Sequence, residues 1–389
     1  MLLVKFLRRE FQWLIISSDE HPILDGEGLE KFILHGYDPE LGWRRKPGTW
    51  HDEQGKYGTT RYHIDMDGAR CRPGHEHFPV YAVCYGDSFT FCRQVNDNET
   101  WEYFLSEKLR AGVLNFGVGN YGLDQALLRM ERELNSQSPR IVIMGVVPST
   151  IVRILCVWKH YNEFGNTFGF KPRFDLKDSR LIYIKNIIDH ESKFPEYEKY
   201  LDRIKVNDYF YESKFRREMI RFPYLFHIWK NAFRNIPLIS ILLIGKLFKV
   251  AGIRNHWLED YPLMKIMQIN LKLRYRLFKD RYACDLFLGI IERFREFVLA
   301  RGMRPVFLFL PQKDDVLFIK KRGYYYRDLI RSVGEKLVTV DMTDILLAAD
   351  DLDTLYSDDN VYGGHFSKDG NCFVAEELYK KLKENNLLE

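Results

Sequence analysis

The stretch "YAVCYGDSFTFCRQV", residues 81–95, joins an apolar run to a polar turn and then to a segment of helical character. The run ends at Gly86, Asp87 and Ser88, a composition that is common in turns. Ser88 is therefore either a nucleophile held at the end of a strand or an ordinary residue of a strand-to-helix turn. Because a tripeptide recurs by chance, the answer depends on what else the chain brings to the same place.

Five short runs rich in Val, Ile and Leu predict buried parallel strands. They lie at residues 81–86, 113–118, 141–147, 305–311 and 337–342. Helical patterns separate most of these runs, such as "GLDQALLRMERELNSQSP" after the second. This alternation predicts an α/β fold with three layers, α/β/α, in which helices cover both faces of a mostly parallel five-stranded sheet.

Two segments outside these runs differ from them in composition. Residues 1–80 are dense in Gly, Pro, Asp and aromatic residues, which predicts an N-terminal β-rich extension. Residues 156–284 carry long charged and aromatic helical patterns, which predict a helical insertion or lid. The predicted core is therefore made of residues 81–155 and 285–389.

The composition favours some classes of protein over others. Lys and Arg number 58 against 54 Asp and Glu, and the two signs are interspersed, so we expect no nucleic-acid partner. The cysteines are scattered without a C-x-x-C pair, which favours reduced thiols and a cytoplasmic location. They are Cys71, Cys84, Cys92, Cys156, Cys284 and Cys372. The first 22 residues interleave basic and apolar side chains, unlike a signal peptide.

Residues 235–253, "NIPLISILLIGKLFKVAGI", come closest to a membrane segment. About ten apolar or small residues precede Lys246 and Lys249, fewer than the roughly 18 uncharged apolar residues that span a bilayer. One alternative is a helix at the membrane surface, with its apolar side chains in the interface and its lysines reaching water, which would make the protein peripheral at a membrane. The other is a helix of the core or the lid.

Several polar loops follow the predicted strands, and in a parallel α/β sheet ligand sites form where the carboxyl ends of strands meet. These loops are Gly86–Ser88, "NFGVGNYG" at 115–122 and "GVVPSTIVR" at 145–153, and "YGGHFSKDGN" at 362–371 precedes the last helix. This set suits acyl transfer, because the Ser88 hydroxyl must lose a proton as it attacks and His365 can accept it. The N-terminus of the following helix would keep the His365 imidazole neutral at rest.

An oxyanion formed during acyl transfer needs hydrogen-bond donors where its charge develops. The predicted donors are the backbone N–H groups of Ser88 and Asn120 and the hydroxyl of Thr150. Asn120 lies in a glycine-rich loop and is of a residue type that accepts a left-handed backbone. Asp87, next to the serine, is expected to hydrogen-bond the turn and fix its conformation.

We predict no metal ion and no cofactor. His75 and His77 have the H-x-H spacing that can place two ligands on one face of a strand, but the sequence offers no third ligand nearby. Gly165 and Gly169 do not have the spacing of a phosphate-binding fingerprint.

The motifs "YGDSFT", "NFGVGNYGLDQALLR" and "YGGHFSKDGNCFVAEEL", in this order, resemble the SGNH hydrolases, also called GDSL-type esterases, and especially bacterial members linked to surface-polysaccharide acylation. The resemblance covers residues 81–155 and 300–389. It implies a flavodoxin-like core, Ser88 as nucleophile and oxyanion donor, His365 as general base and a positioning role for Arg153. It also implies an O-acyl substrate, in particular an acetyl group on a carbohydrate hydroxyl.

The sequence departs from the family pattern at three positions. The glycine of the second block falls at Asn120, and the asparagine of the third falls at Thr150, whose side chain is shorter. Tyr362 stands where an aspartate commonly precedes the histidine by three residues. Asp358 or Asp359 is the predicted substitute that holds the histidine tautomer.

Two functions therefore remain open from the sequence. An intact Ser88–His365 pair predicts a serine esterase or acyltransferase. The departures leave the alternative of a catalytically degenerate member that binds carbohydrate or serves as a scaffold.

Overall fold

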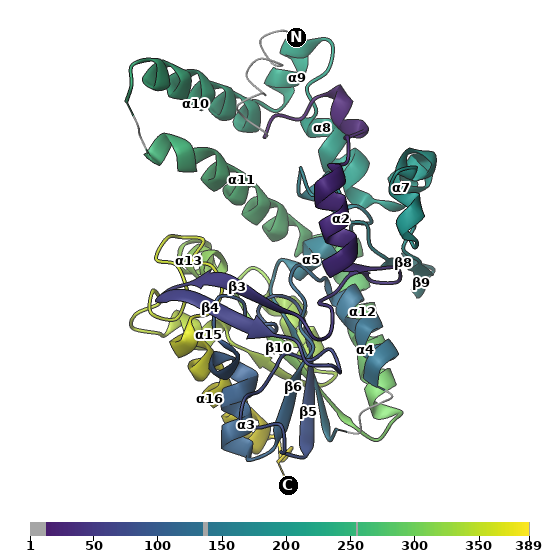
Figure 1. The fold of residues 1–389 in the computed structure, drawn as a ribbon, viewed down its shortest axis with the longest axis vertical. Coiled ribbons are helices and arrows are strands. Elements are labelled where there is room, and N and C mark those ends of the chain that lie inside the picture. Colours follow the sequence, from purple (N-terminus) through teal and green to yellow (C-terminus); the bar gives the residue numbers. More distant parts are fainter. Residues whose placement is uncertain (1–12, 135–138, 254–255, 389) are drawn as a thin grey trace. The chain divides into compact units, whose positions relative to one another are not determined.

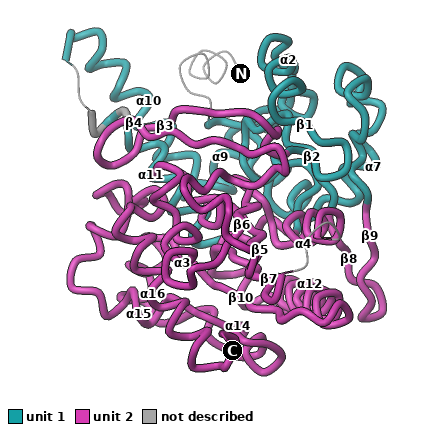
Figure 2. Tube along the Cα trace, turned by 60° about the horizontal axis from the view of Figure 1, so that its bottom comes forward, with its two compact units in different colours: residues 1–43, 155–172, 185–273 teal, residues 44–154, 173–184, 274–389 magenta. Residues whose placement is uncertain are grey.

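The computed structural model describes residues 13–134, 139–253 and 256–388. The chain forms two compact units, coloured separately in Figure 2. Unit 1 consists of residues 1–43, 155–172 and 185–273, and unit 2 of residues 44–154, 173–184 and 274–389. Residues 44–80 belong to the unit that contains the sheet.

Unit 2 is built on a five-stranded, all-parallel sheet in the order β11-β10-β7-β5-β6. The strands are β5 (Val80–Gly86), β6 (Gly112–Asn115), β7 (Ile141–Val146), β10 (Arg304–Phe309) and β11 (Val338–Asp341). Every residue of β7 is buried, as expected for a sheet covered on both faces, and this explains the unbroken apolar run in its sequence. All five predicted runs form strands, so the predicted α/β fold class is confirmed.

Helices cover both faces of this sheet and complete three layers (Figure 1). On one face, α3 (Trp101–Leu109) packs against α16 (Lys368–Glu384); on the other, α4 (Leu123–Glu133) packs against α12 (Arg281–Leu299). The first face buries a large core that includes Leu105 of α3 and Leu378 of α16. The layers therefore hold the sheet rigidly from both sides.

The strand order places the site-forming end of the sheet between β5 and β7. Read as 2-1-3-4-5 in chain order from β6 to β11, it is the flavodoxin-like order, whose binding crevice lies between the first and third strands. Here Gly86 pairs with Gly145 at the carboxyl ends of β5 and β7. A Cβ on Gly86 would lie 1.9 Å from the Gly145 carbonyl oxygen, so only glycine fits.

The remaining elements of unit 2 are two hairpins and several short helices. The hairpins pair β3 (Trp50–Gly55) with β4 (Gly58–His63) and β8 (Arg173–Lys177) with β9 (Arg180–Ile184). The helices are α5 (Thr150–Arg153), α13 (Lys313–Arg322), α14 (Arg327–Gly334) and α15 (Thr343–Leu347), with a 3-10 helix at Asp97–Glu99.

Unit 1 is mostly helical. Its N-terminal part holds a 3-10 helix (Ser17–Glu20), α2 (Gly26–His35) and the short strands β1 (Tyr37–Asp38) and β2 (Gly42–Trp43). The later helices are α6 (Lys159–Asn162), α7 (Leu201–Asn207), α8 (Arg216–Glu218), α9 (Tyr224–Lys230), α10 (Ala232–Val250) and most of α11 (His256–Leu277), with 3-10 helices at Glu191–Lys193 and Tyr197–Tyr200 and a π-helix at Tyr211–Phe215. In the described ranges, no helix combines the length and hydropathy that crossing a membrane requires.

We expect Thr90→Val to lower the free energy of unfolding by about 1–2 kcal/mol, because it removes a buried donor while keeping the side-chain volume. The Thr90 hydroxyl is inaccessible and donates to the Gly145 carbonyl at 2.7 Å. Urea unfolding would measure the loss. Thr59→Val is the matched control, since Thr59 lies exposed in β4 and its change should stay within about 0.5 kcal/mol. Equal effects of the two substitutions would contradict this account.

Candidate active site

Asp87 ties together the ends of the two central strands. Its carboxylate is fully buried and accepts hydrogen bonds from the backbone N–H of Phe89 at 2.9 Å and of Val147, after β7, at 2.9 Å. Arg153 adds a charged hydrogen bond through Nη1 at 3.2 Å. Burial raises the pKa of Asp87, and the positive charge of Arg153 opposes that rise. The turn that carries Ser88 is therefore fixed from the inside of the protein.

Ser88 sits at the start of the turn after β5 and is 7 % exposed. Its carbonyl accepts from the Arg93 backbone N–H at 3.3 Å, which closes the loop behind it. Among the described residues no hydrogen bond joins the Ser88 hydroxyl to His365. Phe89, the residue after Ser88, contacts His365: the centroids of their rings lie 4.9 Å apart.

His365 is held by Gln94, a residue that the sequence analysis missed. The His365 Nδ1 lies 2.8 Å from the Gln94 Oε1. The same oxygen accepts from the backbone N–H of His365 at 3.1 Å and from the Ser357 hydroxyl at 2.9 Å. Because an amide oxygen only accepts, Nδ1 carries the proton in this arrangement, and Nε2 is left as the basic nitrogen.

The two carboxylates predicted to orient His365 lie elsewhere. Asp359 is exposed and pairs with Lys56 Nζ at 3.1 Å, and the exposed Asp358 accepts from the Asn360 backbone N–H at 2.9 Å. Within the described residues neither hydrogen-bonds to His365. The contact expected from a carboxylate is made instead by the neutral amide of Gln94.

The surroundings of His365 favour its neutral form. Burial lowers the pKa of the imidazole to about 3, and the positive charges of Arg93 and Arg153 add to this effect. Among the residues that the structure describes, no carboxylate opposes this shift. The imidazole is therefore neutral, and an imidazolium at this position would receive little stabilisation.

The loop that carries Gln94 is strained and firmly anchored. Cys92 and Gln94 have positive φ values of 57° and 68°, which side chains other than glycine adopt at a cost. The buried guanidinium of Arg70 donates to three carbonyls of this loop, those of Phe91, Cys92 and Val95, at 2.7, 2.5 and 2.6 Å.

The β3–β4 hairpin holds Gln94 from the other side. Glu53 accepts from the Gln94 backbone N–H at 3.0 Å and from Arg93 Nε at 2.9 Å. The Gln94 side-chain Nε2 donates to the Gln54 carbonyl at 3.3 Å. Strain held by this many contacts is typical of a functional site.

The predicted oxyanion donors lie in different settings. Asn120 is exposed in the loop after β6 and has a φ of 65°. Thr150 is fully buried, and its hydroxyl accepts from the Leu123 backbone N–H at 2.8 Å at the start of α4. This burial gives Thr150 a structural contact and removes it from the surface that a substrate reaches.

Two arginines flank the glycine-rich loop after β6. Arg153 donates to the Tyr121 carbonyl at 3.0 Å, so it links this loop to the Asp87 turn. The Cδ of Arg93 lies 4.0 Å from where a Cβ on Gly119 would stand. Asn115 completes the support, because its Nδ2 donates to the Thr90 carbonyl at 2.7 Å.

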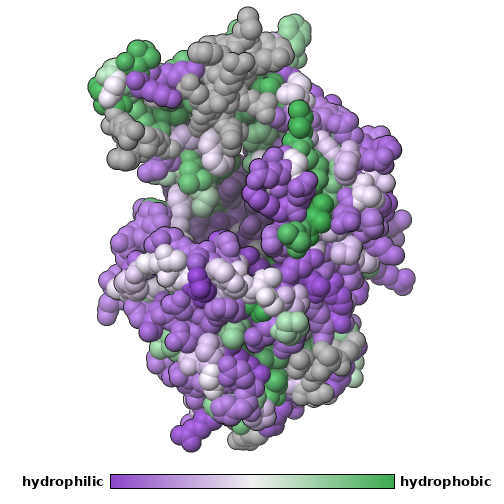
Figure 3. All heavy atoms as spheres, viewed as in Figure 1, coloured by the Kyte–Doolittle hydropathy of each residue, from purple (hydrophilic) through white to green (hydrophobic). Residues whose placement is uncertain are grey.

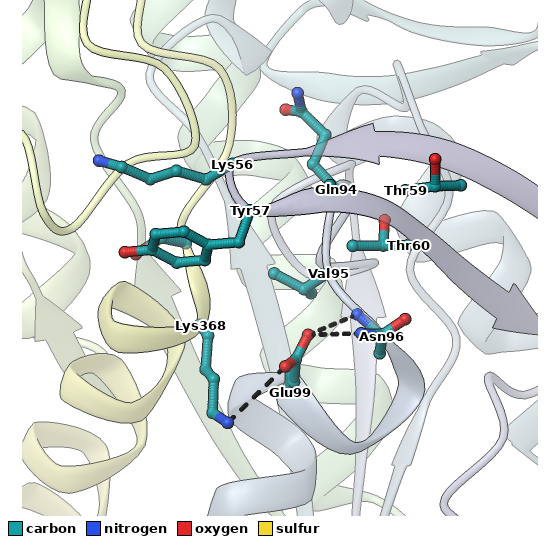
Figure 4. Close-up of a pocket in the computed structure, with 11 residues that line it drawn as sticks. Lys56, Tyr57, Thr59, Thr60, Gln94, Val95, Asn96, Glu99 and Lys368 are labelled. Carbon is teal, nitrogen blue, oxygen red and sulfur yellow. Dashed lines mark hydrogen bonds and ion pairs between the residues drawn. The ribbon is translucent and has the colours of Figure 1, made fainter.

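A small pocket of about 90 Å³ lies beside Gln94, between the hairpin turn and the start of α16 (Figure 4). Lys56, Tyr57, Gln94 and Lys368 are among its lining residues. Glu99 pairs with Lys368 at 3.7 Å across its lower edge. Ser88 and His365 do not line this pocket, so it adjoins the Gln94 side of the histidine.

His75 and His77, the H-x-H pair, both pack against aromatic rings. His75 stacks between the rings of Phe78 and Tyr103, with centroid distances of 4.8 and 4.3 Å. Throughout the described part of the chain, no group of three or more His, Cys, Asp or Glu side chains is placed to hold a metal ion.

No family model and no curated protein sequence matches the chain. Among solved structures, it is similar to a member of the lipolytic protein G-D-S-L family from Veillonella parvula DSM 2008, with 9% identity over 77% of this chain and 97% of that one and a TM-score of 0.35. An acetyl xylan esterase has 12% identity, covers 77% and 98%, and has a TM-score of 0.34. A lipase/acylhydrolase from Enterococcus faecalis has 11% identity, covers 79% and 96%, and has a TM-score of 0.33.

Because Gly364 has no side chain, the Gln94 side chain can pack against its backbone. Its φ is 70°, and an added Cβ would lie 2.9 Å from Gln94 Oε1 and 2.2 Å from Ser357 Oγ. We expect Gly364→Ala to cost about 1–2 kcal/mol of backbone strain plus a further 1–3 kcal/mol as these groups are displaced.

Gly323→Ala is the control for the strain alone, because Gly323 has a φ of 90° and nothing within 4 Å of the added Cβ. Urea unfolding of both variants gives the two free energies. If Gly364→Ala were no more destabilising than Gly323→Ala, the tight fit around Gln94 would be refuted.

Proposed function

We propose that this protein is a serine-dependent acylhydrolase or acyltransferase with Ser88 as nucleophile and His365 as general base. The observation that carries the proposal is the 2.8 Å contact between Gln94 Oε1 and His365 Nδ1, which directs the basic Nε2 away from Gln94. Ser88, Asp87 and Gln94 lie in one short segment after the central strand β5, so the nucleophile and the group that orients its base share one anchored loop.

The proposed reaction has two steps. The Ser88 Oγ attacks the ester carbonyl carbon and passes its proton to His365 Nε2, which then protonates the leaving alcohol as the acyl-enzyme forms. Water or an acceptor hydroxyl next attacks the acyl-enzyme, gives its proton to Nε2, and releases Ser88 with its proton restored. The backbone N–H groups of Ser88 and Asn120 are the proposed oxyanion donors. The hydroxyl of Thr150 is not part of this proposal.

We propose an O-acyl group, in particular acetyl on a carbohydrate hydroxyl, as the substrate class. The support is the ordered set of motifs around Ser88, Asn120 and His365 and their resemblance to enzymes of polysaccharide acylation. An amide in place of the usual carboxylate suits a general base that works without a charged partner, as the Cys-His-Asn arrangement of papain-like proteases does.

Ser88→Ala should abolish both covalent labelling by a fluorophosphonate and hydrolysis of p-nitrophenyl acetate, because both need the serine oxygen as nucleophile. Ser192→Ala is the matched control: the exposed Ser192 hydroxyl also lies 2.8 Å from a histidine, the Nδ1 of His190, but outside the proposed site. Mass spectrometry would locate the label. Wild-type protein that is neither labelled at Ser88 nor active on the ester would exclude the hydrolase.

Gln94 should control the pH dependence of the reaction. Because the folded-state pKa of His365 is about 3, the base stays neutral down to that pH, so the acid limb of kcat/KM should lie well below the usual histidine pKa of about 6.5. Gln94→Glu places a carboxylate at Nδ1, stabilises the imidazolium and should move the acid limb upward. Gln94→Ala should lower kcat roughly a hundredfold or more with a smaller effect on KM.

Asn98→Asp is the control for added charge, because it converts an exposed amide four residues away to a carboxylate. An acid limb that moves equally in Gln94→Glu and Asn98→Asp would show that Gln94 does not orient the base.

The alternative is a binding protein that has lost turnover, and the low pKa of His365 is the observation that favours it. Such a protein would bind carbohydrate equally well with Ser88 replaced by alanine and would hydrolyse no ester. Isothermal titration of the Ser88→Ala variant with acetylated and deacetylated xylan oligosaccharides, beside the labelling experiment, separates the two functions.

A further inference from the structure

Helices α9 and α10 of unit 1 expose an unusual amount of apolar surface. Leu225, Phe226 and Trp229 of α9 are exposed, and so are Phe233, Leu247 and Val250 of α10. We call these six side chains the apolar ridge. The exposed fractions reach 70 % for Trp229 and 89 % for Val250. Figure 3 shows hydrophobic side chains, in green, on the outside of α10. Contiguous apolar surface of this kind marks an interaction site.

The part of the ridge on α10 follows one helical face. Exposed positions recur there at 233, 236, 240, 243, 247 and 250, always three or four residues apart, which is the spacing of one side of a helix. All of them except Ser240 are apolar. The opposite face of α10 is also apolar, and its Leu238 and Leu242 pack against Leu14 and Ile220 within unit 1. The helix is therefore covered by its own unit on one side and open along the other.

The charges around the ridge have one sign. No Asp or Glu occurs between Glu218 and Glu259, whereas this interval contains several lysines and arginines. Lys230 and Lys249 are exposed beside the ridge. Arg234, in contrast to these two lysines, is buried, and it pairs with Glu218 at 3.2 Å. A segment with an exposed apolar face, with lysines and arginines but no acidic residues in its sequence, is complementary to an anionic lipid surface.

We propose that the apolar ridge lies in the surface of an anionic bilayer, with Lys230 and Lys249 at the level of the headgroups. The aromatic side chains Phe226 and Trp229 suit the interface between acyl chains and headgroups. The cysteines of the described chain are all free thiols, which fits the reducing side of a membrane, where the anionic leaflet faces the cytoplasm. This binding mode is independent of the proposed hydrolase activity.

Sedimentation of the full-length protein with lipid vesicles tests this proposal. We expect binding to vesicles of phosphatidylcholine mixed with phosphatidylglycerol, with weaker binding to phosphatidylcholine alone and at high salt. The double variant Trp229→Glu, Leu247→Glu should lower the partition coefficient by more than about tenfold. The double variant Val206→Glu, Met66→Glu is the matched control, since it adds the same charge at two other exposed apolar positions and should change binding much less.

A second pair of substitutions tests the charge. Lys230→Gln with Lys249→Gln should weaken binding to the anionic vesicles and leave binding to phosphatidylcholine unchanged. Three outcomes would overturn the proposal: no binding of wild-type protein to anionic vesicles, equal loss in the ridge and control variants, or a lipid-free dimer that only the ridge variant converts to monomer. The last result, read by light scattering, would identify a second copy of the chain as the occupant.

Discussion

The hydrogen bonds of the buried Asp87 carboxylate are the interaction on which the candidate site depends. They join the turn after β5 to the backbone after β7 and to Arg153, which in turn holds the loop after β6. A carboxylate without water around it is tolerated only when such donors surround it. Three loops from three strands thereby meet at the point where the strand order reverses, and Ser88 stands at their junction.

The site combines a half-buried, neutral histidine with a neutral orienting amide. Arg93 and Arg153 lie close enough to lower the pKa of His365, yet both are paired, with Glu53 and Asp87. The arrangement keeps the imidazole unprotonated at almost any pH. An imidazolium formed there would receive little electrostatic stabilisation. Its electrostatics therefore favour the unprotonated form of the imidazole and make it a weak base.

Much of this fold follows from sequence pattern, because buried parallel strands leave unbroken apolar runs and all five runs form strands. Ser88, Asn120 and His365 could be singled out because they end strands or precede a helix. Gln94 could not be singled out, because an uncharged side chain in a loop has no feature in the sequence that marks it as functional. Its positive φ cannot be predicted from the sequence either. Charge and proximity in sequence favour Asp358 and Asp359, whereas the contact to His365 comes from across the fold.

The contact between Gln94 and His365 spans 271 residues of sequence. Loop-closure entropy makes such a contact late to form, and it requires the sheet to be complete and α16 to be docked beside α3. During synthesis the loop that carries Ser88 and Gln94 emerges long before His365. The candidate site is therefore assembled only after the segment that follows β11 has been made and has folded against the sheet.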